Sequence, residues 1–206
     1  MNLFQTIISD NIFLGLNEID RWDRKRTIKN ETVGGHTLDV TMMVRTAVEE
    51  ILPHYAYKEK LEITTDATGH DFDENFSGDV NHDVKYNEIN GAEIRKALKV
   101  FCETRCKQYF NLPTKSHHMW IQSTTNKSEY SHDLIKVFDW ISMGVFCKRE
   151  IALGNSTFNK TFDYCKSSLI KACDKSEESM RKMCEDRNYT IDSDFSLYNQ
   201  IKNLNW

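Results

Sequence analysis

The segment DLIKVFDWISMGVFCKREIAL, residues 133–153, is the part of the chain that most directly indicates the fold. Between Leu134 and Leu153 apolar residues occupy most sides of a helical projection, as in a helix surrounded by protein. Gly154-Asn155 then has the composition of a left-handed helix end. We therefore predict a buried helix over 134–153, in the middle of the fold.

A second helical pattern follows Gly34-Gly35. Apolar residues recur there at i, i+4, i+7, i+8, i+11 and i+12, the spacing of one helix face. They are Val40, Val44, Ala47, Val48, Ile51 and Leu52. His36 lies one turn before Val40, and we place it on the same inward face.

Weaker patterns divide the remaining chain. We predict a helix over 3–20, a basic loop over 21–29, a segment over 60–76, a helix from Gly91 to Phe110 and two helices within 157–206. The stretch KSEESMRKMCEDR (175–187) is interpreted as a solvated face and nothing more. The polar span 111–132 is a candidate loop or lid over a pocket.

Composition favours one all-α domain. The chain has 206 residues, 39% of them hydrophobic, but only two prolines and eight glycines for strand turns. We expect a core over about 1–160 and C-terminal helices over about 161–206. The net charge of −4 argues against a general surface for nucleic-acid polymers or acidic membranes.

The cysteines and the N-terminal stretch indicate the compartment. Six cysteines contain no CxxC pair, so we expect reduced thiols in the cytosol. The stretch from Leu3 to Leu16 contains polar residues and has no basic start, so neither a signal peptide nor a membrane span is expected. These features predict a cytoplasmic protein.

Four residues together offer the ligand set of one divalent metal ion. Two imidazoles and two carboxylates suit a hard or borderline cation with open positions for water and phosphate oxygen. The residues are His36, His70, Asp71 and Asp139. Asp139 lies in the most apolar segment, where an unpaired carboxylate costs several kcal/mol, so a buried partner is expected. That partner is either the metal ion or Arg149.

The adjacent pair His70-Asp71 restricts how the ion is held. Neighbouring residues on a helix point about 100° apart, so both reach one cation only if it sits between them or the helix ends there. Glu74 follows at i+4 from His70 and i+3 from Asp71, on the metal side of the segment. There it could hold a water molecule or accept its proton.

The order H…HD…D is the pattern of the HD phosphohydrolase superfamily. Three blocks of the chain, covering roughly 18–160, resemble bacterial HD-domain 5′-deoxynucleotidases. They are RWDRKRTIKNETVGGHT (21–37), HDFDENFSGDVNHDVKY (70–86) and FDWISMGVFCKREIALGNSTF (138–158). The resemblance implies an HD-domain helical bundle, a homodimer or higher homo-oligomer, and hydrolysis of a nucleotide phosphate ester.

The resemblance also implies a role for each matching residue. One divalent ion, Co, Mn, Mg or Zn, would be held by His36, His70, Asp71 and Asp139. Glu74 would orient or deprotonate the attacking water, and Asp79 would assist near the phosphate and metal. Arg21 would bind phosphate, Trp22 would pack on the sugar and disfavour a 2′-hydroxyl, and Lys85 would lie close to the pocket.

Departures from the family pattern surround this site. Gly35 stands where the family usually has a glutamate, and residues 81–83 replace a proline-bearing turn. The segment LEITTDATG (61–69) is more polar than the family's apolar helix. These changes leave the ligand set intact, and they bear on the identity of the substrate.

Several functions remain open from sequence. The leading hypothesis is removal of the 5′-phosphate from deoxynucleoside monophosphates. A deoxynucleoside triphosphohydrolase of the phage dATP type is the nearest alternative, and a non-catalytic nucleotide-binding HD module is another. A cyclic-nucleotide phosphodiesterase is disfavoured because the chain has no GYP triplet. Surface or lid roles are expected for His117, His118 and His132.

Overall fold

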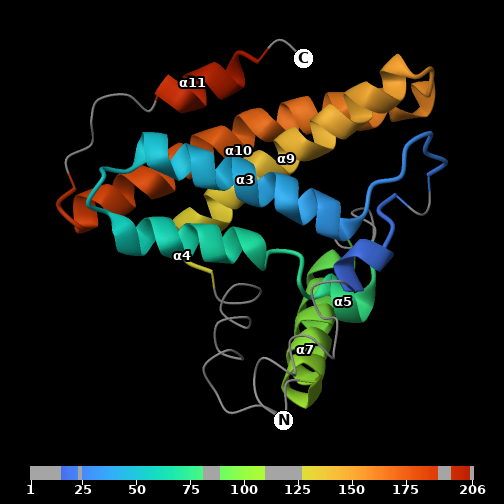
Figure 1. The fold of residues 1–206 in the computed structure, drawn as a ribbon, viewed down its shortest axis with the longest axis horizontal. Coiled ribbons are helices and arrows are strands. Elements are labelled where there is room, and N and C mark those ends of the chain that lie inside the picture. The colour runs from blue at the N-terminus through green and yellow to red at the C-terminus, as the bar shows by residue number, and fades with distance from the viewer. Residues whose placement is uncertain (1–14, 23–24, 81–88, 110–126, 190–195, 205–206) are drawn as a thin grey trace. The chain divides into compact units, whose positions relative to one another are not determined.

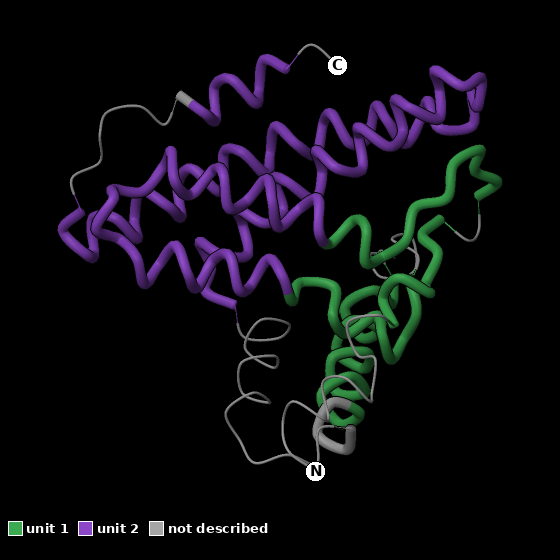
Figure 2. Tube along the Cα trace, in the orientation of Figure 1, with its two compact units in different colours: residues 1–37, 69–126 green, residues 38–68, 127–206 purple. Residues whose placement is uncertain are grey.

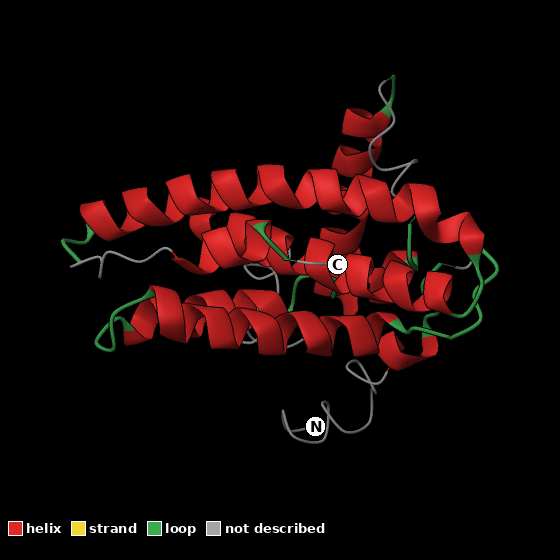
Figure 3. Ribbon diagram, turned by 90° about the horizontal axis from the view of Figure 1, so that it is seen from above, coloured by secondary structure: helices red, strands yellow, loops and turns green. Residues whose placement is uncertain are grey.

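The structure is a computed structural model that describes residues 15–22, 25–80, 89–109, 127–189 and 196–204. Within these ranges the secondary structure is helical and contains no strand, as Figures 1 and 3 show. The α-helices are α3 (Val33–Ile51), α4 (Tyr57–Thr68), α5 (Glu74–Ser77), α7 (Gly91–Tyr109), α9 (Glu129–Ala152), α10 (Asn159–Asp186) and α11 (Ser196–Lys202). The predicted all-α class is confirmed. No helix in the described part of the chain is long and apolar enough to cross a membrane.

The chain divides into two compact units, coloured separately in Figure 2. Unit 1 comprises residues 1–37 and 69–126, and unit 2 comprises residues 38–68 and 127–206. Helix α3 begins in unit 1 and continues in unit 2. The single domain expected from the chain length stays a prediction.

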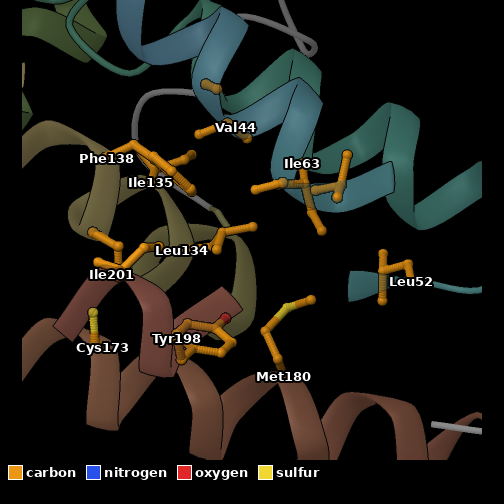
Figure 4. Close-up of a cluster of buried hydrophobic side chains, with 14 of the residues drawn as sticks. Val44, Leu52, Ile63, Leu134, Ile135, Phe138, Cys173, Met180, Tyr198 and Ile201 are labelled. Carbon is orange, nitrogen blue, oxygen red and sulfur yellow. The ribbon is translucent and has the colours of Figure 1, made fainter. Parts of the chain in front are cut away.

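Helix α9 organises the core of unit 2. It packs against α4, α10 and the short 3₁₀ helix η2 (Ser156–Phe158). Figure 4 shows Leu134, Ile135 and Phe138 of α9 among the buried apolar side chains. Each fully buried side chain of this size stabilises the fold by about 1.5–3 kcal/mol relative to exposure. The helix predicted over 134–153 is confirmed, and it begins earlier, at Glu129.

Helix α3 supplies a second wall of this core. Its predicted apolar face is confirmed, because Val40, Val44 and Val48 are fully buried in the same cluster as Leu134. Ile51 is half-buried and packs against the cluster. The spacing of the apolar residues thus predicted which side of α3 turns inward.

The turn after α9 follows the sequence prediction closely. Gly154 has φ +98°, the left-handed region that glycine adopts without a Cβ penalty. Its N–H donates to the carbonyl of Ile151 at 2.9 Å, and the N–H of Asn155 donates to that of Glu150 at 2.9 Å. These two bonds form a Schellman motif, which satisfies carbonyls at the helix end and lets the chain turn into α10.

The stretch 175–187 lies on α10 and corrects one prediction. We predicted a solvated face only, but this stretch also contributes core residues to unit 2: Ser176, Met180, Met183 and Cys184 are buried. Buried positions recur along α10 every three or four residues, so one stripe faces the core while the charges face outward. The two predicted C-terminal helices, α10 and α11, are confirmed. They pack against each other, and Ser176 and Tyr198 share a buried hydrogen bond of 2.8 Å.

Buried polar groups of α4 explain why its sequence is unusually polar. The Glu59 side chain, 1% exposed, accepts a hydrogen bond from Tyr189 Oη at 2.6 Å and pairs with Arg187. Asp66 accepts one from Ser131 Oγ at 2.6 Å. Buried polar groups are tolerated when they are bonded, so these contacts connect α4 to α9 and to the end of α10 within unit 2.

Unit 1 contains the short helix η1 (Leu16–Glu18), α5 and α7, and α5 packs against α7. The helix predicted over 91–110 is confirmed as α7. Most of the helix predicted over 3–20 and most of the span 111–132 lie outside the described residues, although residues 129–132 already belong to α9. The described cysteines Cys102, Cys147, Cys165, Cys173 and Cys184 form no disulfide, which agrees with the predicted thiols.

Candidate metal centre and substrate site

His36 lies in the first turn of α3. Its backbone N–H donates to the carbonyl of Thr32 at 3.0 Å, and its side chain is fully buried. The apolar residue one turn later, Val40, is also fully buried. The inward orientation of His36 predicted from the helical spacing is therefore confirmed.

His70 and Asp71 lie in the turn between α4 and α5. The segment predicted over 60–76 consists of two helices joined by this turn, because α4 ends at Thr68 and α5 begins at Glu74. Within this turn the N–H of Phe72 donates to Gly69 O at 3.2 Å and that of Glu74 to Asp71 O at 3.0 Å. The end of the helix is what allows two adjacent side chains to face one point.

The three side chains converge within unit 1. His36, His70 and Asp71 each offer a ligand atom, and these atoms all lie within 4.8 Å of one another. Asp71 Oδ2 is 3.2 Å from His70 Nε2 and 3.6 Å from His36 Nε2. The two imidazole rings are 5.5 Å apart between centroids.

This donor set fits a divalent transition metal. Metal bonds of about 2.0–2.2 Å place neighbouring ligand atoms about 3–3.6 Å apart. The two separations of Asp71 Oδ2 from the histidine nitrogens, 3.2 and 3.6 Å, lie in this range. Imidazole and carboxylate together suit Mn, Co, Fe or Zn. The histidine side chains are buried and the Asp71 side chain is 23% exposed, so solvent reaches the cluster at Asp71.

Glu74 and Asp79 flank this cluster in sequence. Glu74 is the first residue of α5 and is buried. The predicted i+4 relation to His70 does not apply, since His70 lies in a turn outside the helix. Asp79 follows Gly78, whose φ of +70° lets the chain turn sharply, and its Oδ2 accepts the backbone N–H of Trp22 at 3.2 Å. Asp79 therefore positions Trp22.

Arg21 and Trp22 are held beside the start of α3. The N–H of Arg21 donates to Glu31 O at 2.8 Å, and the N–H of Val33 donates to Ile19 O at 2.9 Å. Trp22 has φ +65°, a rare conformation for a bulky residue that costs of order 1–3 kcal/mol. Such strain persists where surrounding contacts hold the backbone in place. Here the Asp79 carboxylate accepts the backbone N–H of the strained residue Trp22.

The sequence did not single out Glu31. Its Oε2 accepts hydrogen bonds from Arg21 Nη1 at 3.2 Å and from Trp22 Nε1 at 3.0 Å. The Arg21 guanidinium also lies 5.7 Å from the centre of the Trp22 ring. Glu31 sits inside the first block of the resemblance, but nothing in its spacing signalled a contact with both residues.

Asp139 is buried in unit 2, as predicted. Of the two partners considered for it, the metal ion stays a prediction and Arg149 was wrong. Lys136 Nζ, and not Arg149, donates to its Oδ2 at 2.6 Å. Its role as a fourth metal ligand stays a prediction. Lys85 and the histidines 117 and 118 lie outside the described residues. The His132 side chain is 53% exposed, in agreement with its predicted surface role.

Comparison with known proteins defines the class. The fold is similar to that of an HD-domain phosphohydrolase from Listeria innocua, with a TM-score of 0.62, 18% sequence identity, and coverage of 86% of this chain and 84% of that one. The model of the YfbR-like 5′-deoxynucleotidases matches residues 11–184, and the chain belongs to that family. It is thus a deoxynucleotide phosphohydrolase of this family, and its fold is that of an HD-domain phosphohydrolase. No curated protein matches the chain.

Proposed function

We propose that this protein removes the 5′-phosphate from deoxynucleoside monophosphates with one divalent metal ion. His36, His70 and Asp71 would hold the ion, with Asp139 as the fourth ligand. The convergence of three donor atoms within 4.8 Å in unit 1 carries the proposal. Two imidazoles favour Mn²⁺, Co²⁺ or Zn²⁺ over Mg²⁺, which prefers oxygen ligands.

The catalytic step follows from the residues around the ligands. When bound, a divalent ion polarises a phosphoryl oxygen and makes water a better nucleophile near neutral pH. Glu74 takes a proton from the attacking water while the water oxygen bonds to phosphorus. The bond from phosphorus to the 5′ oxygen then breaks, and that oxygen takes up the proton held by Glu74, directly or through water. The products are inorganic phosphate and a deoxynucleoside, and Glu74 returns to its carboxylate form. The buried setting of Glu74 suits it to act as this base.

Substrate recognition would use residues other than the metal ligands. Arg21 neutralises charge on the phosphoryl group, and Lys85 adds a second positive charge. Trp22 packs on the sugar, where its ring leaves no space for a 2′-hydroxyl. The support for placing both groups together is that Arg21 and Trp22 donate to the same oxygen of Glu31 in unit 1, while Asp79 accepts the backbone N–H of Trp22.

A substrate panel tests this proposal. The metal-free protein is reloaded with Mn²⁺, Co²⁺, Zn²⁺ or Mg²⁺ and incubated with each dNMP, NMP and dNTP, and the products are separated and identified. We expect inorganic phosphate and deoxynucleoside from dNMPs, and little release from NMPs. Tripolyphosphate from dNTPs, or no hydrolysis of any nucleotide, contradicts the proposal. The expected homodimer and cytoplasmic location stay predictions.

A further inference from the structure

One carboxylate oxygen in unit 1 binds both residues assigned to substrate recognition. Glu31 Oε2 accepts from Arg21 Nη1 at 3.2 Å and from Trp22 Nε1 at 3.0 Å. The side chains of Glu31 and Arg21 are 14% and 11% exposed, so solvent screens the ion pair less than it would at the surface. The two backbones are also hydrogen-bonded, since the Arg21 N–H donates to the Glu31 carbonyl at 2.8 Å.

The Trp22 residue is thereby held at two places. Asp79 accepts its backbone N–H, and Glu31 accepts its indole N–H. A tryptophan side chain has only two rotatable bonds, so one hydrogen bond at the indole nitrogen largely determines the direction of the ring. The plane of the ring then depends on the charge state and length of the residue at position 31.

The Arg21 guanidinium depends on the same oxygen. A guanidinium has five N–H donors in a rigid planar arrangement, so one contact with Glu31 is compatible with a two-point contact to a phosphate. Holding the long arginine side chain in place in advance reduces the rotamer freedom that is lost when phosphate binds. Loss of the Glu31 charge would therefore weaken phosphate binding through Arg21.

We propose that Glu31 is a positioning residue that sets phosphate affinity and sugar selectivity together. It aligns Arg21 and Trp22 through one shared acceptor, so a change at Glu31 alters both properties at once. This inference rests on the proposed function, in which Arg21 meets the phosphate and Trp22 meets the sugar. Glu31 itself need not contact the substrate.

The first test is Glu31→Gln, which keeps the size of the side chain and removes its charge. We expect KM for a dNMP to rise about tenfold, the loss associated with one charged hydrogen bond, while kcat changes less than about threefold. The ratio of kcat/KM for dNMP over NMP should fall about tenfold in parallel. A purely structural role would lower the amount of folded enzyme without changing this ratio.

The second test is a double-mutant cycle with Trp22→Phe, which keeps an aromatic ring but lacks the indole N–H. We expect Trp22→Phe alone to reduce the deoxy-over-ribo ratio, and Glu31→Gln to reduce it little further in that background. Fully additive changes, or an unchanged ratio in Glu31→Gln, overturn the proposal. If Glu31→Gln does not fold, Trp22→Phe in the native background decides, and an unchanged ratio there overturns it.

A control separates failure of this inference from failure of the proposed function. Arg21→Ala and Trp22→Ala are measured with the same substrates, and metal content and thermal unfolding are recorded for every variant. If these two variants change KM and the sugar ratio while Glu31→Gln changes neither, only the role of Glu31 is wrong. If Arg21→Ala and Trp22→Ala also change neither, the proposed substrate site is wrong.

Discussion

The Asp71 carboxylate lies 3.6 Å from Nε2 of His36, so the turn after α4 and the first turn of α3 meet at one point. Taken alone, either residue could be a metal ligand or an ordinary polar group in the protein interior. Together with His70 they bring three donors within 4.8 Å, a separation that one cation can bridge. The proposed metal-dependence of the reaction rests on this contact between distant segments.

Replacement of Asp71 by Ala should remove both metal and activity. The imidazoles would lose the anionic ligand that lies between them, so affinity for a divalent ion should fall steeply. Metal content after dialysis and phosphate release from dNMPs measure the effect. Asp73→Ala is the matched control, because Asp73 lies in the same turn outside the ligand cluster. Equal loss of metal in both variants would indicate collapse of the turn instead.

Asp139 and Lys136 together test the fourth ligand. If Asp139 binds the metal, Asp139→Ala should lose metal, while Lys136→Gln should retain it and keep most of the hydrolytic activity. If Asp139 serves only as the partner of Lys136, at 2.6 Å, the two variants should behave alike. Isothermal titration calorimetry with the metal ion, carried out on both variants, distinguishes these outcomes.

Glu74→Gln should separate catalysis from metal binding. The amide has the size of the carboxylate but cannot accept a proton from water, so we expect kcat to fall by about 10²–10⁴-fold. Metal content should remain near that of the unmodified protein, because Glu74 is not in the cluster of His36, His70 and Asp71. Loss of the metal in this variant would instead make Glu74 a ligand.

Glu59 should make stability depend on acid pH. Burial by itself raises the pKa of this carboxyl, but the hydrogen bond from Tyr189 and the charge of Arg187 outweigh it and place the pKa below its ordinary value of 4.5. The ionised form is therefore stabilised in the folded state. This contribution is present above pH 4.5 and is lost as the pH falls through the lower folded-state pKa.

Urea unfolding of Glu59→Gln measures that contribution. We expect the free energy of unfolding to fall by about 1–3 kcal/mol at pH 7, since a buried hydrogen-bonded charge is removed. The difference from the unmodified protein should shrink below pH 4.5. Glu178→Gln, at an exposed position of α10, should change stability by less than about 0.5 kcal/mol. A difference that stays constant with pH would contradict the assignment.

Gly154→Ala should destabilise unit 2 through the backbone alone. A Cβ at Gly154 would meet no atom within 4 Å, but φ is +98°, which L-residues rarely adopt. We expect a loss of about 1–2 kcal/mol for Ala and a smaller loss for Asn, which tolerates left-handed conformations better. Urea unfolding measures both losses as shifts of the midpoint concentration, provided that the dependence of the unfolding free energy on urea is unchanged. Equal losses for Ala and Asn would not fit a backbone origin.

The helices could be predicted because their signal is local. The buried stripes of α3 and α9 repeat with the period of a helix, and Gly154 marks a helix end by its own conformational freedom. Local sequence pattern was a poor guide to burial in two places. The charged stretch 175–187 carries core residues on its other side, and the polar segment 61–69 is accommodated by partners far away in sequence.

The candidate site was only partly predictable for the same reason. The order of His36, His70 and Asp71 is visible in the sequence, and the resemblance attaches a role to each. Their convergence depends on where α4 ends, which the pattern over 60–76 did not reveal. Lys136, three residues from Asp139, was missed as its partner because side-chain reach cannot be deduced from composition.

The sequence by itself determined the all-α class and the inward faces of α3 and α9, because these depend on residue type and short-range spacing. Its resemblance to a known family named the candidate metal ligands. The tertiary structure alone decided that a turn brings His70 and Asp71 against His36, and that Glu31 joins Arg21 to Trp22. Such contacts join segments distant in the chain. They arise from how helices and turns pack, which a local periodicity does not encode.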